Sequence, residues 1–219
     1  MNGIKINLNL AINRVVSILI VSDFLLFFAF GLMAPIFAVF IQGDVIGGGL
    51  KVIGLATTVY WLVRAVTAVP LSRWMDKTDG EKDEYYFMII GSFILAVVPF
   101  FYVVATRPIH IYILQAIYGL SHSMAVPAWR IIFTNHLDTG RTGFEWSIED
   151  VGVGVAIALS AYGGAFVADK FGFDTLFYLV GILGLVGAFV LIPLAKNMLT
   201  LREMRKLHRQ RFRGPINPS

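Results

Sequence analysis

Six long apolar stretches constrain the fold of this chain more than any other feature of its sequence. A bilayer core about 30 Å thick requires roughly 20 apolar residues per helix, and each stretch has about that length. The stretches run from Val15 to Ile41, Val52 to Leu71, Tyr86 to Val104, Ile109 to Phe133, Val151 to Val167 and Thr175 to Leu194. None of them alternates apolar and polar residues as the strands of a membrane barrel do. We therefore expect an all-α membrane protein with six transmembrane helices.

The composition excludes several classes of function. The chain is 57% hydrophobic and 15% charged, whereas soluble domains average about 45–50% apolar and about 25% charged residues. It has no cysteine, which rules out thiolate metal sites and a cysteine nucleophile. The four histidines, His110, His122, His136 and His208, show no metal-ligand spacing. No phosphate-binding glycine loop or nucleophile elbow is present. We predict no metal, no cofactor and no enzymatic activity.

The net charge of +4 does not indicate nucleic-acid binding, because seven of the eighteen Lys and Arg residues follow Leu194. They form a basic tail, residues 196–219, after a transmembrane domain at 15–195 and an N-terminal segment at 1–14. Leu201, Met204 and Leu207 recur at spacing three in this tail. Two readings stay open: a short helix on an anionic lipid surface, or a disordered tail that only sets the orientation.

Basic residues outside the apolar stretches predict the orientation, since Lys and Arg concentrate on the cytoplasmic side. One side has three, Lys51, Arg107 and Lys170. The other has thirteen: Lys5, Arg14, Arg73, Lys77, Lys82, Arg141, Lys196, Arg202, Arg205, Lys206, Arg209, Arg211 and Arg213. Both termini are therefore expected in the cytoplasm, and the protein is expected to be a multi-pass component of a bacterial or archaeal plasma membrane.

The two halves of the chain share a short pattern. The second apolar stretch ends in RWMDKTDG, residues 73–80, and the fifth ends in FVADKFG, residues 166–172. Both contain Asp-Lys followed closely by Gly. Three helices separate the copies, which places them on opposite membrane faces. This is the mark of an inverted-topology repeat of two three-helix units.

The same residues resemble a known family. Asp76, Lys77 and Gly80 match positions of GxLADRxGRK, the loop signature of the major facilitator superfamily. The passage from Gly163-Gly164 to Phe171-Gly172-Phe173 is similar to the family's link between its fifth and sixth helices. The resemblance covers essentially the whole chain as one six-helix half. It implies a secondary transporter, with helices one and four lining a central cavity.

A full family member has two such halves. The resemblance therefore implies a second six-helix unit, either another copy of this chain in a homodimer or a different half-size partner. One departure concerns the energy source: Gln115 stands where the family's RxxQG element has an arginine linked to proton coupling. That substitution argues against the usual form of proton-driven antiport.

Ionisable groups inside a bilayer are functional candidates, because inserting one costs about 2.5–3.5 kcal/mol. Asp23 and Arg64 both lie roughly 10–12 Å from the cytoplasmic boundary, at 1.5 Å per residue. Two interpretations follow. The residues contact the solute or a coupling ion, or they form a structural ion pair between helices one and two.

Further candidates lie on helix four. Gln115, His122 and Trp129 share one face, as Trp61 and Arg64 do on helix two. His122 can bind solute or titrate, or it can be a structural histidine. The stripe of aromatic side chains is either a ligand site or plain helix packing.

A group at the cytoplasmic side is expected to control gating. Asp76, Lys77 and Gly80 belong to the signature loop, and the resemblance implies that this loop latches the two halves. Arg130 is placed to meet Glu149, Asp150 or Asp76, although a side chain that simply extends to the membrane surface is the alternative.

The leading hypothesis is secondary transport of a small solute by two six-helix units in alternating access. The alternative is a membrane scaffold or sensor module that does not transport. The expected partners are a small solute, membrane lipids and a second six-helix unit, with no nucleic acid.

Overall fold

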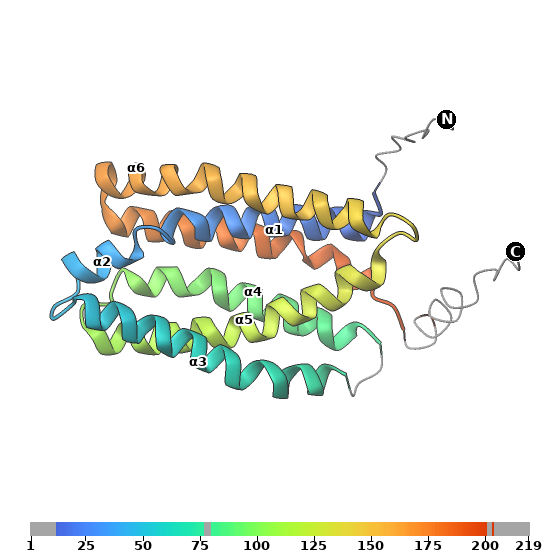
Figure 1. Cartoon of the computed structure of the whole chain (residues 1–219), viewed down its shortest axis with the longest axis horizontal. Coiled ribbons are helices and arrows are strands. Elements are labelled where there is room, and N and C mark those ends of the chain that lie inside the picture. The colour runs from blue at the N-terminus through green and yellow to red at the C-terminus, as the bar shows by residue number, and fades with distance from the viewer. Residues whose placement is uncertain (1–11, 77–79, 201–202, 204–219) are drawn as a thin grey trace, which may run out of the picture.

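The chain folds into a bundle of long helices that lie side by side (Figure 1). The computed structural model describes residues 12–76, 80–200 and 203. Within that part every regular element is helical: α1 (Arg14–Met33), α2 (Phe37–Gly43), α3 (Leu50–Met75), α4 (Lys82–Tyr102), α5 (Pro108–His136), α6 (Thr142–Val190) and the 3₁₀ helix η1 (Ile192–Asn197). The all-α prediction is confirmed.

Four stretches are long and apolar enough to cross a membrane: Arg14–Gly43, Leu50–Met75, Lys82–Tyr102 and Thr142–Asn197. The helix α5 is not among them. Its sequence is interrupted by polar side chains, including Gln115, Ser121, His122 and Ser123. Three of them, Gln115, Ser121 and Ser123, are buried, whereas Ile109 and Ile113 of the same helix are exposed, so α5 has a polar inner face and an apolar outer face.

Two breaks modify the predicted helices. The first apolar stretch is interrupted between Met33 and Phe37, next to Pro35, because proline lacks the N–H that a continuous helix needs. The long helix α6 contains Gly172 with φ 83° and ψ 167°, a left-handed backbone that glycine adopts at little cost. The chain therefore leaves the helical path there, between the fifth and sixth predicted stretches.

Several helix ends differ from their predicted positions. The helix α4 begins at Lys82 and α6 at Thr142, so charged residues expected in loops form first helical turns. At the start of α1, the Asn13 Oδ1 atom accepts a hydrogen bond from the Val15 N–H at 2.9 Å, which satisfies one free donor of the helix. Pro108 opens α5, where its fixed φ suits the first helical position.

The packing order follows the pairs that touch: α1 lies along α6, α3 along α5, and α4 against both α5 and α6. Small residues permit this. A Cβ atom added to Gly164 of α6 would lie 1.8 Å from the Leu32 carbonyl oxygen of α1. One on Gly119 of α5 would lie 2.5 Å from the Tyr60 carbonyl oxygen of α3. These helices approach closely only because the side chain is missing.

Two apolar clusters close the two ends of the bundle. One contains Phe40, Tyr102 and Phe177, with the Phe40 and Phe177 rings 4.8 Å apart. The other contains Leu19, Met88 and Phe133 and lies at the end where α1 begins and η1 ends. The space between the clusters holds the polar residues that interrupt the helices.

Candidate binding cavity

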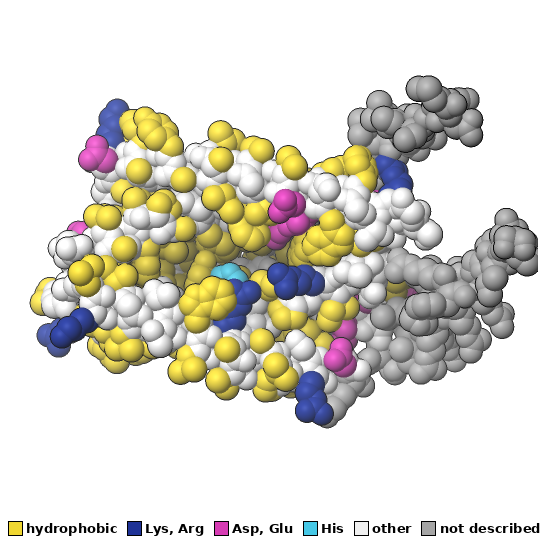
Figure 2. All heavy atoms as spheres, viewed as in Figure 1, with side chains coloured by type: hydrophobic (Ala, Val, Ile, Leu, Met, Phe, Trp, Pro, Cys, Tyr) yellow, Lys and Arg dark blue, Asp and Glu magenta, His cyan; other side chains and the backbone are white. Residues whose placement is uncertain are grey.

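A cavity of about 1030 Å³ occupies the middle of the bundle, between the two apolar clusters. Its walls come from α1, α3, α4, α5 and α6. Figure 2 shows basic, acidic and histidine side chains gathered in the hollowed middle of a face that is otherwise largely apolar. The volume is suited to a small organic molecule.

All six residues predicted to contact solute or a coupling ion line this one cavity: Asp23, Trp61, Arg64, Gln115, His122 and Trp129. Two of the predicted gating residues, Arg130 and Glu149, also line it. Asp76, Gly80 and Asp150 do not, and Lys77 lies outside the described residues. The placement brings the candidates together, while their roles stay predictions.

The Arg64 guanidinium is surrounded by aromatic rings. Its Nη1 atom donates a hydrogen bond to the Tyr60 hydroxyl at 2.9 Å. The Cζ atom lies 5.0 Å from the centre of the Trp61 ring, a cation–π distance. No ion pair joins Arg64 to a carboxylate in the described part of the chain. The predicted pair with Asp23 is therefore not formed in this conformation.

Hydrogen bonds between helices hold Arg64 in place. The Ser123 hydroxyl of α5 lies within hydrogen-bonding distance of the Arg64 carbonyl oxygen at 3.1 Å and of the Gly119 carbonyl oxygen at 3.0 Å. The Thr67 hydroxyl lies 2.8 Å from the Ser123 oxygen and 2.7 Å from the Val63 carbonyl oxygen, which adds a second polar contact between α3 and α5. Together with the close approach at Gly119, these contacts hold the part of α3 that carries Arg64 against α5.

His122 faces the same group. Its Nδ1 atom lies 3.2 Å from the Tyr118 carbonyl oxygen. A carbonyl oxygen only accepts, so this hydrogen bond requires the proton on Nδ1 and leaves Nε2 of the neutral ring as an acceptor. The His122 ring also packs edge to face against Tyr118 at 4.7 Å and Tyr60 at 5.5 Å.

The charged neighbours of Asp23 are Glu149 on α6 and Arg130 on α5, which act on it electrostatically. All three side chains line the cavity. The cavity therefore contains two carboxyl groups with a basic neighbour, separate from the aromatic group around Arg64.

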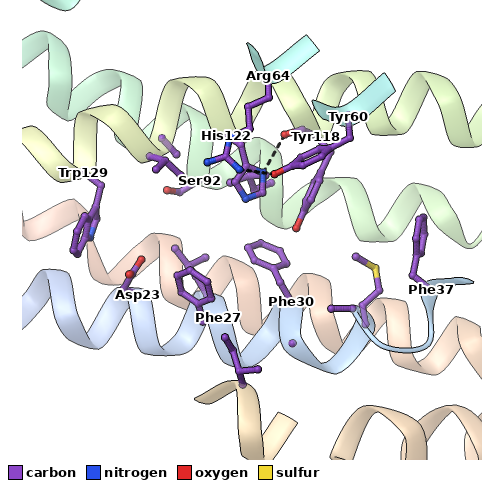
Figure 3. Close-up of a pocket in the computed structure, with 18 of the residues that line it drawn as sticks. Asp23, Phe27, Phe30, Phe37, Tyr60, Arg64, Ser92, Tyr118, His122 and Trp129 are labelled. Atoms are coloured by element: carbon purple, nitrogen blue, oxygen red, sulfur yellow. Dashed lines mark hydrogen bonds between the residues drawn. The ribbon is translucent and has the colours of Figure 1, made fainter. Parts of the chain in front are cut away.

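Apolar side chains from α1 complete the wall opposite Arg64. Figure 3 shows Phe27 and Phe30 directed from α1 toward His122 and Tyr118 across the cavity. The Phe30 ring meets the Tyr118 ring edge to face at 5.8 Å. A bound molecule therefore meets a cation on one side and a largely apolar surface on the other.

Sequence reasoning did not single out Tyr60 and Tyr118 as cavity residues. A signal was available, because each lies four residues before a candidate, Arg64 and His122 respectively, and residues four apart share a helix face.

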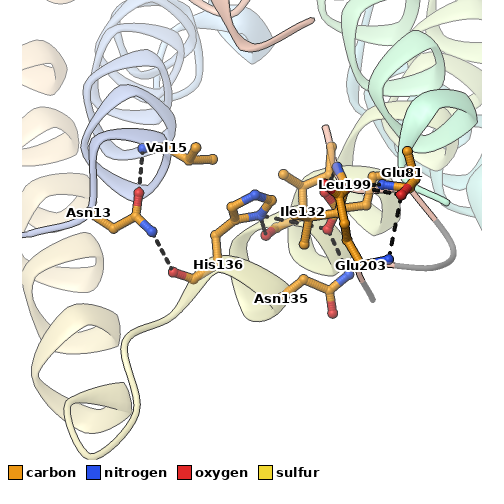
Figure 4. Close-up of polar contacts among 9 residues, drawn as sticks. Asn13, Val15, Glu81, Ile132, Asn135, His136, Leu199 and Glu203 are labelled. Atoms are coloured by element: carbon orange, nitrogen blue, oxygen red, sulfur yellow. Dashed lines mark hydrogen bonds and ion pairs between the residues drawn. The ribbon is translucent and has the colours of Figure 1, made fainter. Parts of the chain in front are cut away.

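The signature-loop region forms a second polar cluster, away from the cavity (Figure 4). The buried Glu81 carboxylate accepts hydrogen bonds from the Asn135 amide and the Leu199 N–H, both at 2.9 Å. It lies 3.6 Å from His136 Nδ1, and the Glu81 N–H donates to the Leu199 carbonyl oxygen at 2.9 Å. Burial raises the pKa of Glu81, while the Leu199 N–H, the His136 charge and the Asn135 amide act in the opposite direction.

Long apolar helices around a cavity with charged groups on its walls are the features of a membrane transporter. The sequence profile described as Major Facilitator Superfamily matches residues 19–213. The chain belongs to this family, so it is an integral multi-pass membrane protein of a transporter family and not an enzyme. The predicted family is confirmed.

Two known proteins show the extent of the similarity. An uncharacterized MFS-type transporter of Bacillus subtilis (strain 168), YitZ, is 25% identical over 158 residues, which cover 72% of this chain and 93% of that protein. The crystal structure of the POT family transporter PepTSo matches with a TM-score of 0.67 at 15% identity, over 94% of this chain and 39% of that chain. The chain thus corresponds to a little over a third of that transporter's length.

Proposed function

We propose that the chain is one six-helix half of a secondary transporter, which moves a small solute by alternating access together with a second six-helix unit. The observation that carries this proposal is the cavity of about 1030 Å³ with Asp23, Arg64, His122 and Glu149 on its walls. Placing charged groups within the membrane has a free-energy penalty, and such groups commonly mark the pathway of a solute or ion.

The proposal includes six membrane-crossing helices arranged as two inverted three-helix repeats. Gly80 and Gly172, which follow the two Asp-Lys pairs, support it with nearly equal backbone angles, φ 86° and 83°. Both termini are proposed to lie in the cytoplasm. Single cysteines replacing the exposed Thr106 and Thr139 test this orientation, since only the first should react with an impermeant maleimide added to intact cells.

The second unit is proposed to be another copy of this chain or a different half-size partner. The helix α3 supports this, because Ala56 and Met75 are its only buried residues. The first part of α6 is similarly exposed at Val151, Val155 and Tyr162. Both helices also contribute to the cavity walls, so a partner seated on them would complete the cavity.

Flux in proteoliposomes tests transport. A broad solute panel should contain compounds that enter vesicles with the protein faster than vesicles without it. Asp23→Asn should lower that flux about tenfold or more, because it removes an ionisable group from the cavity; a tenfold change corresponds to about 1.4 kcal/mol. Asp44→Asn is the matched control, since Asp44 is exposed and outside the cavity. Failure of every solute with correctly folded protein would favour the scaffold or sensor alternative.

A further inference from the structure

The Arg64 guanidinium in the cavity forms no ion pair with a carboxylate in the described part of the chain. Asp23 interacts electrostatically with Glu149 and Arg130 rather than with Arg64. Arg64 contacts only the Tyr60 hydroxyl and aromatic rings. A guanidinium has five N–H donors, and one of these is used by Tyr60.

Contacts with α5 and with aromatic rings position both the backbone and the side chain of Arg64. The backbone of Arg64 is tied to α5 through Ser123 and Thr67. The rings of Tyr60 and Trp61 limit the side chain to one region of the cavity. Because these contacts restrict the guanidinium before a ligand arrives, binding loses less conformational freedom.

From this geometry we infer that the transported solute is an organic anion with one negative charge, bound by Arg64, whose apolar body lies against Phe27, Phe30 and Tyr118. A planar guanidinium binds a carboxylate through two parallel hydrogen bonds, so a carboxylate is the matching group. The inference rests on the proposed transport function and adds the chemical class of the solute.

The apolar side of the cavity sets the second requirement. Phe27 and Phe30 face Arg64's helix pair across the space in Figure 3. A solute that carries only a charged group would make no apolar contact with these rings. Burial of apolar surface favours binding, so we expect tighter binding as the apolar part of an acid grows.

Equilibrium binding to the full-length protein in lipid nanodiscs tests the inference with matched probes. We expect 4-phenylbutyrate to bind at least about tenfold more tightly than its neutral amide 4-phenylbutyramide, the factor that 1.4 kcal/mol supplies. It should also bind more tightly than butyrate, which lacks the ring. The amine 4-phenylbutylamine should bind more weakly than the acid.

Variants locate the effect. Arg64→Gln should abolish the preference for the acid over the amide, and Arg64→Lys should keep part of it, because lysine retains the charge without the planar pair of donors. Arg73→Gln is the matched control, since Arg73 lies on α3, is exposed and is outside the cavity. Arg64→Lys and the wild-type ranking decide the question if Arg64→Gln does not fold.

Equal affinity for acid and amide in the wild type, tighter binding of the amine, or a preference that survives Arg64→Gln would each overturn the inference. The transport proposal and the present inference fail through different experimental outcomes. Binding of the acid through Arg64 without flux would refute transport alone, whereas flux without a preference for anions would refute the present inference alone.

Discussion

At the scale of single residues, one missing side chain controls how closely α1 and α6 approach. Gly164 lies where a Cβ atom would come within 1.8 Å of the Leu32 carbonyl oxygen and 2.7 Å of the Leu32 Cα atom. Backbone atoms cannot move aside as the end of a flexible side chain can. Gly154, on the same helix, has open space in the corresponding direction.

We therefore expect Gly164→Ala to destabilise the protein by about 1–3 kcal/mol, as overpacking does. Gly154→Ala should be neutral or slightly stabilising, since alanine favours helix by about 1 kcal/mol over glycine. Thermal unfolding of the two purified variants, followed by tryptophan fluorescence, measures the difference. Equal melting temperatures would show that α6 does not pack on α1 as described.

At the scale of elements, Glu81 joins three segments at one end of the bundle: the start of α4, the end of α5 and the chain after η1. This contact role of Glu81 was not predictable from the sequence, because an acidic residue beside Lys82 and Asp83 has the pattern of an ordinary solvated loop residue. Its burial depends on Asn135 and Leu199, which are 54 and 118 residues away.

This burial predicts a pH effect of a particular sign. Because the pKa of Glu81 is raised on folding, the folded protein binds this proton more tightly than the unfolded chain does. The resulting stabilisation is complete below the ordinary pKa of glutamate and is lost as pH rises through the raised value. Glu81→Gln should therefore show a smaller loss of melting temperature between pH 4.5 and pH 8 than the wild type.

Asp44→Asn is the control for this prediction. Asp44 is exposed and follows α2, at the opposite end of the bundle from Glu81, so its removal should leave the slope close to that of the wild type. A wild-type slope that Glu81→Gln does not reduce would contradict the burial of an ionisable group at this position.

At the scale of the whole molecule, two of the helices that line the cavity, α3 and α6, also have exposed apolar faces. Val66 of α3 and Val155 of α6 are both exposed, at 64% and 46%. Because the chain has no native cysteine, a cysteine-specific cross-linker reacts only with the introduced cysteines. If two copies pair across the cavity in parallel, α3 of one copy lies near α6 of the other.

We expect Val66→Cys combined with Val155→Cys to form dimers with a short bis-maleimide in membranes. The matched control is Ile90→Cys with Ile182→Cys, which are also exposed but lie on α4 and the last part of α6, away from the cavity walls. Dimers from both pairs alike, or from neither, would count against a homodimer built across the cavity. Product mass on a denaturing gel is sufficient to decide.

Much of the candidate site was predictable, because the face of a helix on which a residue lies depends only on its spacing from its neighbours in the sequence. Asp23, Trp61, Arg64, Gln115, His122 and Trp129 were selected as ionisable, polar or aromatic residues within apolar helices, and all six line the same cavity. The partners were not predictable. Asp23 interacts electrostatically with Glu149, 126 positions along the sequence, and forms no ion pair with Arg64, since neighbours across helices depend on rotation and tilt.

The sequence by itself determined the membrane environment, the all-α class and the family, because apolar length and loop signatures are properties of consecutive residues. Only the tertiary structure decided which charges meet and which stay unpaired. Helix packing at Gly164 and Gly119 determines which segments distant in the sequence approach within a few ångströms. Hydrogen bonds and ion pairs form only at such distances, so packing decides whether a guanidinium has a partner. The difference between an ion pair of Asp23 with Arg64 and a free Arg64 facing the cavity is therefore a consequence of packing.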